Sequence, residues 1–114
     1  HRIVLVGCRD IGNHTCVLDK CEVIYRSKYH SINQLTLDKI DFLDIDLDVI
    51  DEKDFSSYSD YLENGLSIKD VKDLIYLSKE QGNSVLSFSE YVPLFDNELK
   101  DLLQIIEMIN LFFR

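Results

Sequence analysis

The chain has 114 residues, of which 46% are hydrophobic and 29% are charged. This length suits one ordinary domain, and the composition is globular, which excludes a disordered chain. Lys and Arg number 12 against 21 Asp and Glu, so the formal net charge is −9. Such a chain lacks the cationic surface that phosphate backbones require, so we expect no nucleic-acid partner. The charge favours cationic partners, such as metal ions and guanidinium groups.

The sequence also limits where the protein works. No apolar run approaches the roughly 20 residues needed to cross a bilayer, and no signal-peptide pattern is present, so we expect no membrane partner. The three cysteines, Cys8, Cys16 and Cys21, are odd in number and lack CxxC spacing. We therefore expect reduced thiols in a cytoplasmic protein, with a soft-metal site formed by all three as the alternative.

Apolar segments of strand length recur along the chain. The first, Ile3–Val6, is apolar throughout, which suits a parallel strand that is buried on both faces. The stretch that follows it is ambiguous. There we expect a loop, a short strand near Glu22–Tyr25 and a short helix or turn near Ser31–Leu37. Two further strands are expected, in Ile40–Ile45 and in Val85–Phe88.

Two helices have clearer signals. Ser67 predicts an N-cap, Asp70 occupies the capping-box position, and Gly82 is a natural residue just past the end. Between them, apolar residues recur with a period close to 3.6 at Ile68, Val71, Leu74, Ile75 and Leu77. The last helix is expected to begin near Asp96 or Asn97. Its broad apolar stripe comprises Leu99, Leu102, Leu103, Ile106, Ile109 and Phe113.

This order of strands and helices predicts the fold class. Strands that alternate with helices indicate βαβ crossovers and a parallel sheet, so the class is α/β. In such sheets ligands bind outside the carboxyl ends of the strands. Candidate site residues should therefore follow the strands.

The segment after the Ile40–Ile45 strand is rich in aspartate. Asp44, Asp46 and Asp48 recur two residues apart, so on an extended strand their carboxylates would share one face. Their repulsion calls for a cation or for raised pKa values. Oxygen ligands select Mg²⁺, Mn²⁺ or Ca²⁺. The alternative is a solvated acidic loop, which the interleaved apolar residues disfavour.

Two known chemistries use similar aspartate patterns. A calcium-binding EF-hand loop is excluded, because Val49 and Phe55 occupy the positions that need Gly and Glu. A haloacid-dehalogenase-like phosphatase would use Asp44 as nucleophile and Asp46 as general acid. Asp48 then occupies the position of Thr or Val, so this phosphatase is the weaker alternative.

Four segments together point to one family. In chain order they read RIVLVGCRD (Arg2–Asp10), LDIDLDVID (Leu43–Asp51), NGLS (Asn64–Ser67) and EYVPLFD (Glu90–Asp96). They resemble, in the same order, the motifs of the arginase/agmatinase (ureohydrolase) family. The resemblance implies the C-terminal part of a parallel-sheet, three-layer arginase-like fold.

The resemblance also implies a site. Asp46 and Asp48 match metal ligands of a binuclear manganese centre, which another divalent metal could also fill. The activated water of that centre attacks the carbon of a linear guanidino or amidino substrate. Glu90 matches the acid that binds the substrate cation. Asp44, which replaces a Ser of the motif, and Asp51 are supporting residues by the same resemblance.

Departures from the family pattern matter as well. Gly12 replaces an acid that binds the α-amino group of arginine, which leaves agmatine, guanidino acids or formiminoglutamate as substrates. The family segments G-G-D-H and D-A-H-x-D, which carry further metal ligands, have no counterpart here. The resemblance thus implies that residues 1–114 form one partial domain that lacks the N-terminal half and is inactive alone. Its partner would be that half or further copies in a homo-oligomer. The alternative is a non-catalytic interaction module or degenerate relative.

Overall fold

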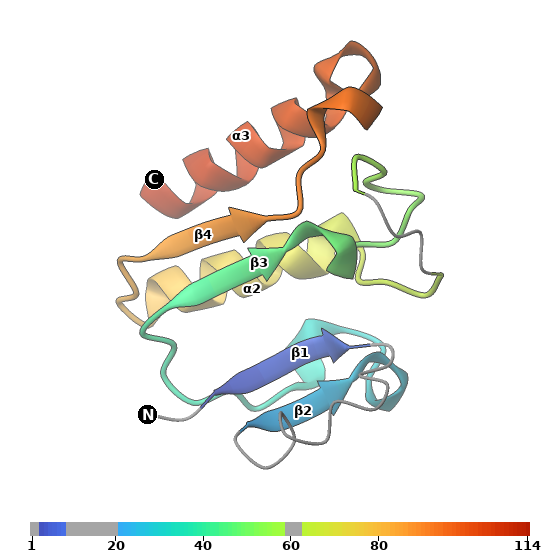
Figure 1. Cartoon of the computed structure of the whole chain (residues 1–114). Coiled ribbons are helices and arrows are strands. Elements are labelled where there is room, and N and C mark those ends of the chain that lie inside the picture. The colour runs from blue at the N-terminus through green and yellow to red at the C-terminus, as the bar shows by residue number, and fades with distance from the viewer. Residues whose placement is uncertain (1–2, 9–20, 59–62) are drawn as a thin grey trace.

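The computed structural model describes residues 3–8, 21–58 and 63–114 (Figure 1). Strand β1 (Val4–Cys8) pairs in parallel with β2 (Glu22–Tyr25), and β3 (Leu43–Asp46) pairs in parallel with β4 (Leu86–Ser89). Helix α2 (Ile68–Glu80) connects β3 to β4, and α3 (Lys100–Phe113) follows β4. The expected α/β class is confirmed. The expectations for Gly12 and Cys16 lie outside the described residues, and Cys8 is a free thiol.

Helix α2 begins where its cap residues predict. The Ser67 hydroxyl accepts a hydrogen bond from the Asp70 amide at 3.1 Å, and the Asp70 carboxylate accepts one from the Ser67 amide at 3.2 Å. The same carboxylate also accepts hydrogen bonds from the Ser67 hydroxyl at 2.6 Å and from the Ile32 amide at 3.2 Å. Asp70 is buried, so these bonds replace its hydration. It therefore joins the start of α2 to the 3₁₀ turn Ile32–Gln34.

Helix α3 begins later than expected. Glu98 and Leu99 have φ values of 62° and 59°, so the regular helix starts only at Lys100. The carboxylate of Asp96 still serves this helix, because it accepts hydrogen bonds from the amides of Asp101 at 3.0 Å and Leu102 at 2.8 Å. The chain thus makes a left-handed turn between the capping side chain and the helix that it caps.

The apolar stripe expected on α3 is only partly on its packed side. Ile105, Met108 and Phe112 are buried against the rest of the fold. Leu103 and Phe113, both assigned to the stripe, are 62% and 78% exposed. Helix α3 is therefore apolar on two sides, and one of them faces outward. No helix within the described ranges is long and apolar enough to cross a membrane.

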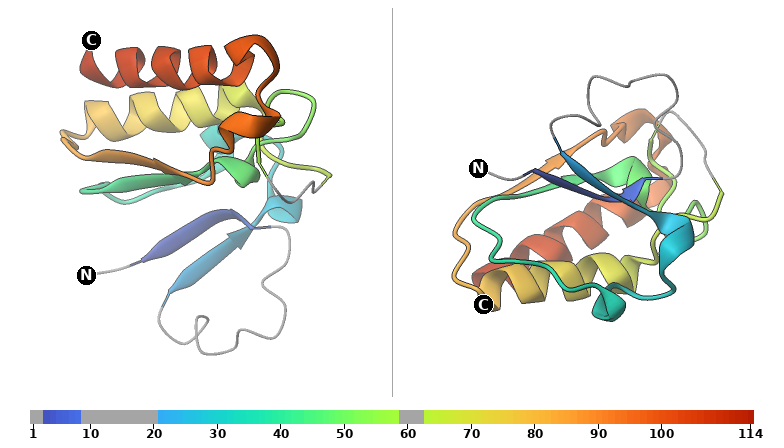
Figure 2. Two further views of the ribbon diagram at one scale, coloured as in Figure 1. Left: turned by 45° about the horizontal axis from the view of Figure 1, so that its top comes forward. Right: turned by 90° about the horizontal axis from the view of Figure 1, so that it is seen from below.

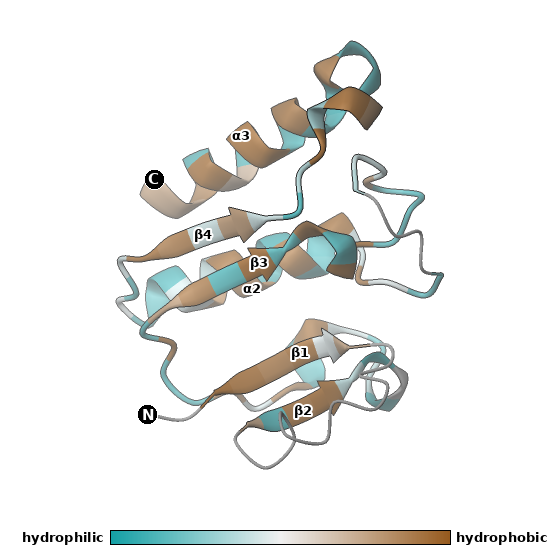
Figure 3. Ribbon diagram, in the orientation of Figure 1, coloured by the Kyte–Doolittle hydropathy of each residue, from teal (hydrophilic) through white to brown (hydrophobic). Residues whose placement is uncertain are grey.

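Both helices lie over one face of the β3–β4 pair (Figure 2). Leu43 and Ile45 point into the core, whereas Asp44 and Asp46 are exposed. This alternation is visible along β3, while β1 is largely hydrophobic (Figure 3). The same core cluster also receives partly buried residues from β1 and β2, namely Val6 and Ile24. One hydrophobic core therefore serves both strand pairs.

Near its end, at Gly7, β1 closely approaches the 3₁₀ turn that follows β3. This residue has a φ of 85°, and a Cβ built on it would lie 2.6 Å from Cγ2 of Val49. The side chain of Leu66 lies just beyond, at 3.2 Å. Apart from Gly7, β1 is only partly buried, so the expected burial on both faces is not observed.

We expect Gly7→Ala to destabilise the fold more than Gly82→Ala. Gly82 has nearly the same φ, 86°, but no described atom lies within 4 Å of its added Cβ. Both changes impose a left-handed residue, which costs about 1 kcal/mol. Only Gly7→Ala adds steric overlap, which costs a further 1–3 kcal/mol, roughly. Urea unfolding of both variants measures this difference, and equal free energies of unfolding would contradict the contact.

Asp70→Asn should lower stability at neutral pH, but not in strong acid. Burial alone would raise the pKa of Asp70, but hydrogen bonds from Ser67 and Ile32 outweigh it and lower the pKa. A lowered folded-state pKa stabilises the fold above the unfolded value of about 3.9. That stabilisation disappears as the pH falls through the folded value. Unfolding from pH 7 to pH 2 should show the two proteins converging in acid. Asp73→Asn, which removes only an ion pair with the exposed Lys69 on the same helix, should change little.

Candidate functional site at the carboxyl ends of β3 and β4

The register of β3 and β4 determines which residues meet at their carboxyl ends. Asp46 is the register partner of Ser89, so both strands end at the same level. Glu90 directly follows Ser89, and the 3₁₀ turn Leu47–Val49, which contains Asp48, directly follows Asp46. The sheet thus brings three residues predicted from the sequence, Asp46, Asp48 and Glu90, to the carboxyl end of its strands. Parallel sheets bind ligands at this end.

The side chain of Asp46 changes the path of the chain after β3. Its carboxylate accepts a hydrogen bond from the Asp48 amide at 3.3 Å, which closes a turn. Asp48 therefore lies beyond the strand and is partly buried, and the expectation that Asp44, Asp46 and Asp48 share one strand face is wrong for Asp48. Asp44 does share the exposed face with Asp46, and it accepts a hydrogen bond from the hydroxyl of Ser87.

Glu90 sits at a sharp turn that its neighbours hold on both sides. It has a φ of 67°, which is uncommon for a residue with a side chain, and it is exposed. Two residues later, the Val92 amide donates to the carbonyl oxygen of Ser57 at 2.7 Å. The Tyr91 hydroxyl donates to Asp96 at 2.7 Å, and this bond raises the pKa of Tyr91 to about 12. The direction of Glu90 is thus determined by the backbone around it.

The segment after Asp48 is held by a second aspartate. The two carboxylate oxygens of Asp51 accept hydrogen bonds from the amides of Lys53 at 3.1 Å and Gly65 at 3.2 Å. Its own amide donates to the carbonyl of Leu66 at 2.8 Å. Asp54 accepts a bond from the Ile68 amide at 2.9 Å. These bonds join both ends of the loop between β3 and α2.

Asp101 and Ser57 are structural residues of this region that the sequence analysis missed. Asp101 is 4% exposed, and its carboxylate accepts hydrogen bonds from the Ser57 hydroxyl at 2.6 Å and the Ser56 amide at 3.0 Å. The bonds cross 44 residues of sequence, so no local pattern predicts them. The one available signal is an acid in the first turn of a helix. Through Ser57, α3 holds the loop that also contacts Val92.

The described residues do not complete a metal site. They include no group of three or more His, Cys, Asp and Glu side chains that could hold an ion. Asp46 and Asp48 offer hard oxygen ligands of the kind that Mn²⁺ accepts, but two carboxylates do not make a closed ligand set. Cys8 is not a ready thiolate ligand, because burial, with Cys21 and Asp48 nearby, raises its pKa. Any further ligands must come from outside the described residues.

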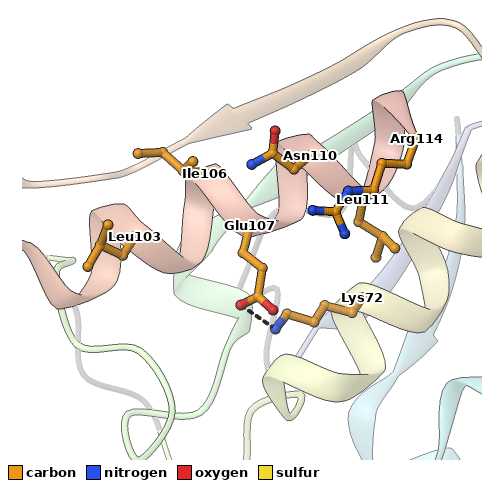
Figure 4. Close-up of a pocket in the computed structure, with 7 residues that line it drawn as sticks. All are labelled: Lys72, Leu103, Ile106, Glu107, Asn110, Leu111 and Arg114. Atoms are coloured by element: carbon orange, nitrogen blue, oxygen red, sulfur yellow. Dashed lines mark hydrogen bonds and ion pairs between the residues drawn. The ribbon is translucent and has the colours of Figure 1, made fainter.

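A cavity of about 440 Å³ lies elsewhere, between α2 and α3 (Figure 4). The ion pair between Lys72 and Glu107, at 2.8 Å, bridges the two helices across it. Its lining contains Leu103, Ile106 and Arg114 but none of the predicted site residues. The chemistry expected at the strand ends therefore does not use this cavity.

Comparison with solved structures identifies the fold. Over 96% of this chain, Bacillus subtilis arginase superposes with a TM-score of 0.76 at 19% identity, and agmatine ureohydrolase of Thermoplasma volcanium with 0.78 at 20%. The chain has the fold of the C-terminal portion of an arginase. Entamoeba histolytica arginase in complex with L-ornithine matches over 97% of the chain, with a TM-score of 0.76 at 20% identity.

These matches concern part of an arginase only. The chain spans 44%, 40% and 42% of the length of the three solved structures. No protein-family model matches the chain, and no curated protein does. The likeness therefore concerns the arginase fold, and the activity of whole arginases is not carried over with it.

The hydrogen bond between Asp101 and Ser57 should couple the stability of α3 to that of the loop between β3 and α2. Asp101→Ala leaves the Ser57 hydroxyl and the Ser56 amide without their acceptor, so we expect a loss of about 2–3 kcal/mol in the free energy of unfolding. Ser57→Ala should lose about 1 kcal/mol. In a double-mutant cycle the two losses should be less than additive by at least about 0.5 kcal/mol. Strict additivity would show that the two side chains act independently.

Proposed function

We propose that this chain is the C-terminal part of a metal-dependent ureohydrolase that cleaves a C–N bond of a linear guanidino or amidino substrate. The observation that supports this most directly is the gathering of Asp46, Asp48 and Glu90 at one end of the β3–β4 pair in an arginase fold. The family resemblance assigns these same residues to metal and substrate.

Two of these residues suit a divalent metal. Asp46 and Asp48 carry carboxylates two residues apart, one at the end of a strand and one in the turn that follows. Both suit a hard or borderline ion such as Mn²⁺. A bound metal pair would supply an activated water for attack on the amidine carbon. The contribution of this chain is to hold the two carboxylates at the carboxyl end of β3.

Glu90 suits the cationic end of the substrate. A carboxylate can accept two parallel N–H bonds from a guanidinium or amidinium group, which orients the reacting carbon. The turn at Glu90 is held by Val92 and Tyr91, so the backbone that carries this carboxylate is fixed without help from the substrate. Asp44 adds negative charge beside this edge.

The proposed activity needs a second segment of polypeptide. Two carboxylates do not close a metal site, and the solved arginases are more than twice as long as this chain. The remaining ligands would come from an N-terminal half, either on the same polypeptide or on a separate one. We expect the 114-residue chain alone to be inactive.

Reconstitution tests this function. The chain is mixed with Mn²⁺, agmatine and the part of Bacillus subtilis arginase that the match leaves uncovered, and urea release is measured. Asp46→Asn or Asp48→Asn should abolish release, because each removes a ligand charge. Glu90→Gln should reduce release by about 10²-fold, because a hydrogen bond to a charged group is worth about 1.5–3 kcal/mol.

Matched controls make the result specific. Glu98→Gln changes a second exposed glutamate with nearly the same φ, 62°, beyond the strand end. Asp41→Asn changes an exposed aspartate that pairs only with Lys39 among the described contacts. Both should release urea at the wild-type rate. Equal activity of Glu90→Gln and Glu98→Gln would remove Glu90 from the site.

A non-catalytic interaction module is the second candidate. The replacement of the motif's Ser by Asp44 favours it. Such a module would bind Mn²⁺ no more tightly than an ordinary acidic surface, with a dissociation constant in the millimolar range or weaker. The two candidates are separated by titrating the reconstituted pair with Mn²⁺ and measuring the free ion by electron paramagnetic resonance. A hydrolase requires tighter binding that Asp46→Asn removes.

A further inference from the structure

The loop between β3 and α2 contains the dipeptide Asn64-Gly65, which takes no part in the proposed reaction. Asn64 is exposed and has a φ of 62°, a left-handed conformation that asparagine tolerates better than most residues. Gly65 is buried, and it has no side chain that would shield its backbone nitrogen from the residue before it. An exposed side-chain amide is thus followed directly by an unhindered backbone nitrogen.

This dipeptide can modify itself without an enzyme. The backbone nitrogen of Gly65, once it has lost its proton, can attack the side-chain carbonyl carbon of Asn64. A C–N bond forms, the side-chain nitrogen leaves as ammonia, and a five-membered succinimide ring remains. Water then opens the ring at one of its two carbonyl groups, which gives aspartate or isoaspartate. The reaction therefore needs only water and a free Gly65 nitrogen.

The fold holds that nitrogen in place. The Gly65 amide donates to Oδ2 of Asp51 at 3.2 Å, and the Gly65 carbonyl accepts a hydrogen bond from Nε of Arg26 at 3.2 Å. On the next residue, the Leu66 carbonyl accepts a bond from the Asp51 amide at 2.8 Å. The Asp51 carboxylate opposes the attack in two ways. Its hydrogen bond holds the N–H group, and its charge disfavours a second negative charge on the nitrogen.

We propose that Asn64 is a deamidation site and that the hydrogen bond from Gly65 to Asp51 keeps it unmodified in the folded chain. The reaction then proceeds through local opening of the loop, so its rate follows the frequency of that opening. Isoaspartate adds one carbon to the backbone between residues 64 and 65. The bonds of Gly65 and Leu66 to their partners then no longer fit together, so the modification prevents the loop from closing again. This proposal does not depend on the proposed hydrolase activity.

A second asparagine provides an internal comparison. Asn83 is also followed by a small residue, Ser84, but it is only 8% exposed. Its side-chain nitrogen donates to the Ser78 hydroxyl at 2.7 Å and to the Val85 carbonyl at 2.8 Å. Its side-chain oxygen accepts a bond from the Val85 amide at 2.9 Å. Because the core encloses this side chain, Asn83 should deamidate only when the whole chain unfolds.

Two aspartate variants test the role of Asp51. The wild type, Asp51→Ala and Asp54→Ala are incubated in mildly alkaline buffer, and deamidation at each asparagine is measured by peptide mapping with mass spectrometry. Asp51→Ala should deamidate at Asn64 at least about tenfold faster than the wild type, because a hydrogen bond to a charged group is lost. Asp54→Ala removes the acceptor of the Ile68 amide in the same loop, so Asn64 should react at close to the wild-type rate. Equal acceleration by both variants would overturn the role of Asp51.

The wild-type chain in urea gives a second measurement. In a denaturing concentration of urea both Asn64 and Asn83 should deamidate, and Asn64 should react at least about tenfold faster than in the folded chain. Deamidation of Asn83 in Asp51→Ala would reveal global unfolding of that variant, and the urea comparison then decides. Equal rates at Asn64 in the folded and the urea-unfolded wild type would overturn the protection. An Asn64 that stays intact in urea would overturn the site itself.

Discussion

The parallel ladder between β3 and β4 is the interaction on which the candidate site depends. These strands are separated by α2 and a long loop, yet their register places Asp46 opposite Ser89. The hydrogen bonds of this ladder therefore determine that Glu90 and the Asp46–Asp48 turn emerge at the same end of the sheet. A slip of one residue would turn Asp44 and Asp46 into the core and Ile45 out to solvent. Burial of Leu43 and Ile45 beneath α2 and α3 excludes that slip, so the hydrophobic core also fixes the position of the carboxylates.

Local signals predicted the elements whose stability is local. The Ser67 and Asp70 side chains determine the start of α2 through contacts within four residues, and the structure has both bonds of that capping box. The apolar runs of β3 and β4 carried enough information for their existence and for the parallel class. The order of acidic motifs likewise led to the arginase fold, because an ordered set of short motifs retains information after overall identity has fallen to about 20%.

What the sequence did not predict depends on contacts between distant residues or on backbone strain. Helix α3 starts at Lys100, later than expected, because Glu98 and Leu99 adopt left-handed conformations that neither residue type favours. Asp48 left the strand because a neighbouring carboxylate bonds to its amide, an alternative that a simple two-residue period ignores. On α3, periodicity alone could not distinguish the side that packs against the core from the second apolar side, since both contain isoleucine and phenylalanine.

Several aspartates of this chain have a structural role, so the net charge alone does not indicate how many carboxylates could bind a cation. Asp51, Asp54, Asp70, Asp96 and Asp101 each accept hydrogen bonds from backbone amides. In this way they anchor turns and helix starts, which other chains often fix with proline or glycine. A carboxylate engaged with amides is already stabilised as an anion and is less available to a cation. Net charge therefore overstates the number of carboxylates that could bind a metal or an amidine. Asp46 closes a turn with one oxygen, yet its side chain stays exposed at the carboxyl end of β3, so it is the structural aspartate that the proposed function also assigns to metal. Glu90 is exposed on a strained turn at the same end of the sheet as Asp46, and the described hydrogen bonds give its side chain no structural role, which is the reason to look for the substrate there.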